Sequence, residues 1–64
     1  MPYLFTERES LERQRQELFT RLAGYQAELD TLPGDKRERR EWLAWRIRRA
    51  LNRIAYLEGQ LAAG

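Results

Sequence analysis

The sequence contains no cysteine and no histidine among its 64 residues. The absence of cysteine excludes disulfide bonds, and the absence of both residue types excludes the usual zinc sites. Both also serve often as enzyme bases or nucleophiles, and no glycine-rich phosphate loop is present. We therefore expect a non-enzymatic protein without a cofactor, a metal ion or catalytic residues.

Long apolar runs are also absent. No stretch approaches the roughly 18 apolar residues that a membrane span needs. The first ten residues, MPYLFTERES, lack the basic start and apolar run of a signal peptide. These absences predict a cytoplasmic protein with no membrane span. So short a chain forms one small domain, which rarely buries enough apolar surface to be stable without a partner.

Lysine is nearly absent as well, because eleven of the twelve basic residues are arginine. The charge is unevenly distributed along the chain. Residues 1–32 carry four arginines and six acids, a balance of −2, whereas residues 33–64 carry eight basic residues and four acids, a balance of +4. Arginine presents a flat, forked donor that stacks on rings and pairs with carboxylates. A GC-rich coding sequence is the alternative explanation for this preference.

Two helices are predicted around one of the two prolines. Thr6 and Glu9 have the spacing of a capping box, which predicts a helix over about 7–31. Asp35 and Glu38 repeat that spacing and predict a second helix over about 36–62. Between them, the segment LPGD at 32–35 predicts a tight turn. The expected fold is all-α, an antiparallel two-helix hairpin in a single domain over residues 1–64.

Apolar residues recur along both predicted helices at alternating steps of mostly three and four, the a/d pattern of a coiled coil. Folding the chain at the turn predicts five facing pairs along the seam: Tyr25–Leu43, Leu22–Ile47, Leu18–Ala50, Arg15–Ile54 and Leu11–Leu57. Arg8 and Arg15 take seam positions themselves. Such arginines either loosen the open end of the hairpin or fix its register. Beside the seam, the same register pairs Glu28 with Arg39 as balancing surface charges and places Arg21 near Arg46.

One side of the seam is apolar or small, which widens the apolar stripe to three positions in seven, as in the interior of a bundle. We name this side the apolar edge. It comprises Phe19, Ala23, Ala44, Leu51 and Ala55. This width predicts that two hairpins pair through the apolar edge as a homodimeric four-helix bundle. A monomer with a broad seam is the alternative.

A second stripe on the C-terminal helix combines aromatic rings with arginine. We name it the aromatic–arginine face. Its members are Trp42, Trp45, Arg46, Arg49, Arg53 and Tyr56. Trp, Tyr and Arg are the residue types enriched in binding hot spots, and the predicted seam does not require them. We therefore expect this face to bind a partner protein with an acidic or apolar-rimmed surface. The alternative is that the rings only cover the rim of the bundle or lie on arginine stems.

Other functions remain open from sequence. In length and expected plan, the chain resembles the small plasmid copy-number regulators that bind paired RNA loops, a resemblance of architecture that implies nucleic-acid binding by the same arginines. A net charge of +2 with ten acids makes that a weaker interpretation. A structural component of a larger particle is a third alternative, since small charged hairpins are common among phage and plasmid proteins.

The residues before the first helix are apolar too. We expect Tyr3, Leu4 and Phe5 to fold over the open end near Leu57 and Leu61. An arm that reaches a partner is the alternative.

Overall fold

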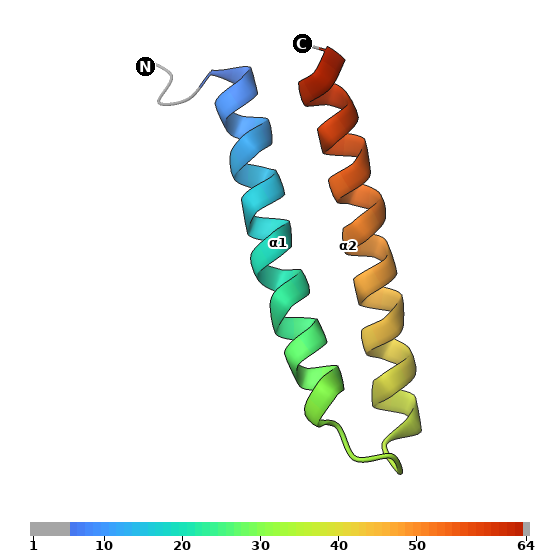
Figure 1. The fold of residues 1–64 in the computed structure, drawn as a ribbon. Coiled ribbons are helices and arrows are strands. Elements are labelled where there is room, and N and C mark those ends of the chain that lie inside the picture. The colour runs from blue at the N-terminus through green and yellow to red at the C-terminus, as the bar shows by residue number, and fades with distance from the viewer. Residues whose placement is uncertain (1–5, 64) are drawn as a thin grey trace.

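The computed structural model describes residues 6–63, which form two helices and one turn. Helix α1 spans Glu7–Thr31 and helix α2 spans Arg37–Ala63. The helices run antiparallel and side by side, so that the start of α1 and the end of α2 meet at the end opposite the turn (Figure 1). The predicted helical hairpin is confirmed. The expected placement of Tyr3, Leu4 and Phe5 lies outside the described residues.

The first helix begins at the predicted capping box. The Thr6 hydroxyl accepts a hydrogen bond of 3.1 Å from the Glu9 backbone N–H, and the Thr6 N–H donates to the Glu9 carboxylate at 3.3 Å. Two backbone donors at the helix start are thereby satisfied. The helix ends at Thr31 because Leu32, which precedes Pro33, adopts extended backbone geometry.

The second helix begins differently from the prediction. The Lys36 N–H donates to the Pro33 carbonyl at 3.1 Å, which closes a turn, and the Arg40 N–H donates to the Lys36 carbonyl at 3.0 Å. Lys36 is therefore the residue that caps the helix, and the capping box predicted for Asp35 and Glu38 is wrong. Asp35 lies within the turn from Pro33 to Lys36, so its side chain is not at the capping position of the helix.

The buried core is unequally shared between the helices. Leu22, Ala50 and Ile54 form a cluster against which Leu18 and Ile47 pack, in agreement with the predicted seam. Among the described residues α2 contributes five buried residues and α1 contributes one. They are Leu22, Leu43, Ala50, Ile54, Leu57 and Leu61.

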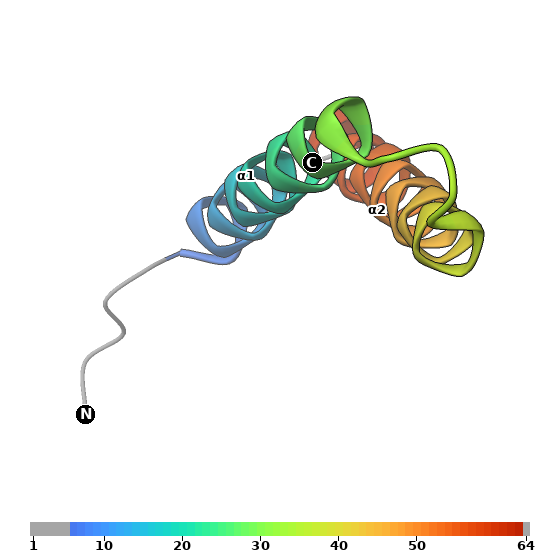
Figure 2. The same cartoon turned by 90° about the horizontal axis from the view of Figure 1, so that it is seen from below.

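Apart from Leu22, the apolar seam residues of α1 are correspondingly only half-buried. They are Leu11, Leu18, Tyr25 and Leu29, and Leu32 just after the helix is half-buried too. A view along the hairpin shows the two helix axes inclined to each other, with no third element over the seam in the described part (Figure 2). The seam is therefore a real but incomplete core, as expected for two helices alone.

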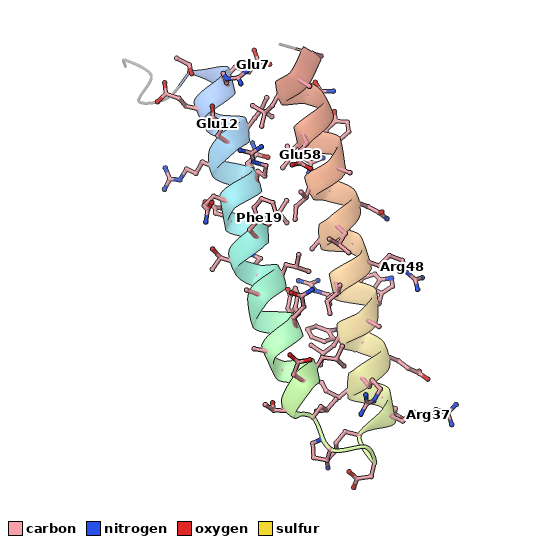
Figure 3. All side chains as sticks on the ribbon, in the orientation of Figure 1. Glu7, Glu12, Phe19, Arg37, Arg48 and Glu58 are labelled. Carbon is pink, nitrogen blue, oxygen red and sulfur yellow. The ribbon has the colours of Figure 1, made fainter. Side chains whose placement is uncertain are left out.

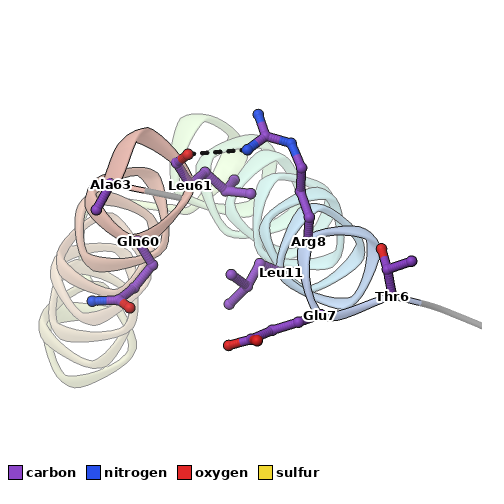
Figure 4. Close-up of a pocket in the computed structure, with 7 residues that line it drawn as sticks. All are labelled: Thr6, Glu7, Arg8, Leu11, Gln60, Leu61 and Ala63. Carbon is purple, nitrogen blue, oxygen red and sulfur yellow. Dashed lines mark hydrogen bonds between the residues drawn. The ribbon is translucent and has the colours of Figure 1, made fainter.

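Both seam arginines find partners on α2. Arg8 donates from Nη1 to the Leu61 carbonyl at 3.1 Å (Figure 4), and Arg15 Nη1 lies 4.0 Å from the Glu58 carboxylate. Leu61 is among the last four residues of α2, whose carbonyls lack partners within the helix. Of the two predicted roles, these cross-helix contacts favour fixing the register.

Neither described helix is apolar enough over a sufficient length to cross a membrane.

Candidate interaction surface

The aromatic–arginine face lies along α2 and is substantially exposed. The exposed fractions are 41% for Trp42, 47% for Trp45 and 54% for Tyr56. Arg49 and Arg53 are exposed, and Arg46 is half-buried. Trp42 and Trp45 lie about one helical turn apart, and the exposed Arg49 and Arg53 lie between Trp45 and Tyr56. The rings and arginines together therefore form an exposed surface available for contact.

Two of the rings pair with arginines of their own helix. The Arg49 guanidinium lies 4.9 Å from the centre of the Trp45 ring, and the Arg53 guanidinium lies 5.0 Å from the centre of the Tyr56 ring. Both distances are within the range of cation–π attraction. These contacts hold ring and cation next to each other, so the face presents flat apolar area and positive charge together.

Trp42 differs from Trp45 because it also contacts α1. Its ring meets the Tyr25 ring edge to face, with centroids 6.0 Å apart and planes at 86°. The guanidinium groups of Arg39 and Arg46 lie 4.3 Å and 5.4 Å from the Trp42 ring centre. Trp42 therefore helps to join the helices. The sequence did not predict this contact, since the heptad pattern places Trp42 away from the seam.

A bidentate ion pair extends this cluster across the hairpin. Arg39 donates to both oxygens of the Glu28 carboxylate, at 2.5 Å and 2.9 Å. The hydrogen bonds from Arg39, with its nearby charge, hold the pKa of Glu28 below its ordinary value against the opposing effect of desolvation. The same bonds raise the pKa of Arg39. The heptad register predicts this pair, which has the shortest N–O distance among the ion pairs in the described part of the chain.

Tyr25 and Arg46 form a second polar contact between the helices. Arg46 donates from Nε and Nη2 to the Tyr25 hydroxyl oxygen, at 3.2 Å and 3.0 Å. The Arg46 guanidinium also lies 5.6 Å from the Tyr25 ring centre. Tyr25 is thus more than a seam residue, because its ring supports Trp42 and its hydroxyl fixes Arg46.

A groove of about 250 Å³ opens between the helices beside this contact. We name it the arginine groove. It is lined by Leu18, Arg21, Tyr25, Arg46, Arg49 and Ala50. The sequence register places Arg21 near Arg46, and the shared groove agrees with that prediction.

The arginines of the chain fall into two groups. Arg8, Arg13, Arg15, Arg37 and Arg39 lie within 4.0 Å of a carboxylate. Within residues 6–63, the arginines without a carboxylate at that distance are Arg21, Arg40, Arg46, Arg48, Arg49 and Arg53. All three arginines of the groove belong to this second group. Positive charge is therefore concentrated where the aromatic–arginine face meets the groove.

The apolar edge is exposed in the single chain. The exposed fractions are 41% for Phe19 and 49% for Leu51, and the three alanines of the edge are also exposed. Phe19 projects from the middle of α1, while Glu12 and Glu58 lie nearer the open end (Figure 3). An exposed apolar strip is what the predicted pairing of hairpins requires, and the pairing itself stays a prediction.

The described residues contain no group of three or more acidic side chains placed to hold a metal ion.

Comparisons with protein-family models, with curated proteins and with solved structures find no match for the chain.

Proposed function

We propose that the chain is a non-enzymatic protein-interaction module that binds an acidic partner protein through its aromatic–arginine face. The observation that supports this most strongly is the stacking of Arg49 and Arg53, which lack carboxylate partners in residues 6–63, on the exposed rings of Trp45 and Tyr56. The surface offers ring area to apolar side chains and forked donors to carboxylates.

The hairpin also acts, in this proposal, as a homodimer. Its support is the half-buried seam of α1 together with the exposed Phe19 and Leu51. Burying the apolar edge against a second copy would cover both features and add the core that a two-helix domain lacks. The aromatic–arginine face would remain accessible on each copy, since the heptad register directs it away from the apolar edge.

The experiment is a capture from the native cell followed by measurement with purified components. The protein retained by the immobilised wild-type chain is identified, purified and titrated by calorimetry against the wild type and Trp45→Ala. We expect Trp45→Ala to weaken binding by about 2 kcal/mol or more, the threshold of a hot spot. Trp45 is preferred to Trp42 because the Trp42 ring also contacts Tyr25 of α1, so that its loss would affect the packing of the helices.

Arg48→Ala is the matched control. Arg48 is exposed, has no carboxylate within 4.0 Å in the described chain and points away from α1 (Figure 3). It lies outside the aromatic–arginine face, so its loss should change the dissociation constant less than threefold. Equal losses for Trp45→Ala and Arg48→Ala would mean that binding is not confined to the aromatic–arginine face and would overturn the proposal.

A further inference from the structure

The arginine groove gathers positive charge without an internal counterion. Arg21 from α1 and Arg46 and Arg49 from α2 line the same space of about 250 Å³. None of the three has a carboxylate within 4.0 Å in the part of the chain that the structure describes. Like charges gathered in this way repel each other, and an anion between them would remove that repulsion.

The groove is also partly preorganised for an anion. Two N–H groups of Arg46 are held by the Tyr25 hydroxyl, and the Trp42 ring lies 5.4 Å from the same guanidinium. The Nη1 group of Arg46 and the hydroxyl hydrogen of Tyr25 have no acceptor among the described residues. A fixed guanidinium loses less conformational freedom when it binds an oxyanion than a mobile one does.

We infer that the arginine groove binds a carboxylate side chain from an acidic segment of the partner protein. This inference rests on the proposed function and identifies the partner's chemistry. Leu18 and Ala50 line the groove with apolar atoms that suit the methylene groups of a glutamate stem, and the arginines and Tyr25 supply donors for its oxygens. The neighbouring aromatic–arginine face would hold apolar side chains of the same segment.

The surroundings of the groove favour a single carboxylate over a nucleic-acid strand. A strand presents successive phosphates and binds best along a continuous basic track. Here the Glu28 carboxylate, paired with Arg39, lies on the same side of the hairpin, about two turns along α1 from Arg21. Ten acids leave the whole chain with a net charge of only +2. The basic region is therefore short and interrupted by negative charge.

The test is an NMR titration that follows the Nε–H signals of the arginines in the full chain. The probes are a capped hexaglutamate peptide, its hexaglutamine counterpart and hexauridylate, each at the same low ionic strength. We expect hexaglutamate to shift the signals of Arg21, Arg46 and Arg49 more than those of Arg37 and Arg48. Hexaglutamine should shift none of them, and hexauridylate should bind more weakly than hexaglutamate.

Variants separate the groove from a general effect of charge. Arg21→Gln should weaken hexaglutamate binding about tenfold, as expected for a lost hydrogen bond to a charged group. The control Arg48→Gln removes the same charge from an exposed site and should change affinity less than twofold. Tyr25→Phe keeps the ring but removes the hydroxyl that fixes Arg46, and it should weaken binding about threefold while the helical circular dichroism is retained.

Two results would overturn the inference. One is an equal shift of all exposed arginines with equal losses for Arg21→Gln and Arg48→Gln, which would indicate unspecific attraction. The other is tighter binding of hexauridylate at the same arginines, which would assign the groove to nucleic acid. Failure of the proposed function is distinguishable, because it appears as a native partner whose binding is unaffected by Trp45→Ala, whatever the titration shows.

Discussion

Trp42 and Trp45 stand three residues apart in one helix and have different surroundings. The Trp42 ring contacts Tyr25 of α1 as well as Arg39 and Arg46 of its own helix, whereas the ring contact of Trp45 is with Arg49 of its own helix. An aromatic pair contributes about 0.5–1.5 kcal/mol beyond its buried area, and a cation–π contact contributes about 0.5–1 kcal/mol at an exposed site. The two residues should therefore respond differently to truncation.

We predict that Trp42→Ala lowers the free energy of unfolding by about 1–3 kcal/mol and that Trp45→Ala lowers it by less than about 1 kcal/mol. Urea unfolding followed by circular dichroism measures both values. An unfolded Trp45→Ala protein would show that this ring belongs to the core and that the assigned helical phase is wrong.

The Glu28–Arg39 pair predicts a specific pH dependence. The pKa of Glu28 is lowered in the folded chain, so the folded state favours the ionised carboxylate. The stabilisation is present at pH values above the carboxyl pKa of the unfolded chain and is lost as the pH falls through the lower pKa of the folded chain. Urea unfolding of the wild type and Glu28→Gln between pH 7 and pH 3 should give curves that differ at neutral pH and converge in acid. A difference that is constant over this range would contradict the assignment.

At the scale of the helices, sequence reasoning succeeded where backbone chemistry decides the outcome. The Thr6 capping box, the turn at Pro33 and the Glu28–Arg39 pair all follow from residue spacing, and the structure contains all three. Helix α2 begins at Arg37, close to the predicted start, but Asp35 lies in the turn closed by the Lys36–Pro33 hydrogen bond and does not cap the helix. Several such local hydrogen-bonding patterns fit one short sequence, and spacing alone does not choose between them.

The candidate site was less fully predicted than the helices. The six residues of the aromatic–arginine face were found from their periodicity, but the contacts of Tyr25 and Arg39 with the Trp42 ring, and of Tyr25 with Arg46, were not. Heptad positions give the direction of a side chain at its Cβ atom, whereas Trp42, Arg39 and Arg46 reach their partners with long side chains. The unequal burial of the two helices was not predicted either. It depends on three-dimensional packing, whereas the a/d spacing is similar in both helices.

The buried residues of α2 should be far more sensitive than the half-buried seam. Leu57 is fully buried, and Ile47 is only half-buried. We predict that Leu57→Ala costs about 2–5 kcal/mol, which is comparable to the whole stability of a small domain. Ile47→Ala should cost less, and thermal denaturation of both variants checks the order. The reverse order would place the centre of the core nearer the turn.

The two helical glycines give an independent test of which surface is free. A Cβ atom added at Gly24 or Gly59 meets nothing within 4 Å. Glycine is about 0.8–1 kcal/mol less favourable than alanine inside a helix, so Gly24→Ala and Gly59→Ala should each raise the unfolding free energy by about that amount. Destabilisation by either variant would show that another surface, such as a second copy, packs closely on that position.

At the scale of the whole molecule, the apolar edge determines whether the hairpin acts alone. If two copies pair through Phe19 and Leu51, folding and association are linked, and stability rises with protein concentration. Sedimentation should give a dimer at micromolar concentration, and Phe19→Glu should give a monomer of low helicity. A wild-type monomer that melts at one temperature over a hundredfold dilution would contradict the dimer.

The aromatic–arginine face and the apolar edge occupy different sides of the hairpin in the heptad register, so pairing and partner binding should be separable. Phe19→Glu should therefore affect partner binding only through the loss of folded protein. Trp45→Ala should leave the sedimentation coefficient unchanged while it weakens partner binding.

The most direct test of the central claim, that the aromatic–arginine face binds a protein, is the salt dependence of binding. The dissociation constants of the native partner and of mixed-sequence RNA are measured for the wild type and Trp45→Ala from low to physiological salt. Phosphate contacts make affinity fall steeply with salt. Binding through desolvated aromatic rings depends less on salt and requires the Trp45 ring. We predict partner binding that persists at physiological salt and is weakened by about 2 kcal/mol or more in Trp45→Ala. Submicromolar RNA binding that disappears near physiological salt and survives Trp45→Ala would contradict the claim.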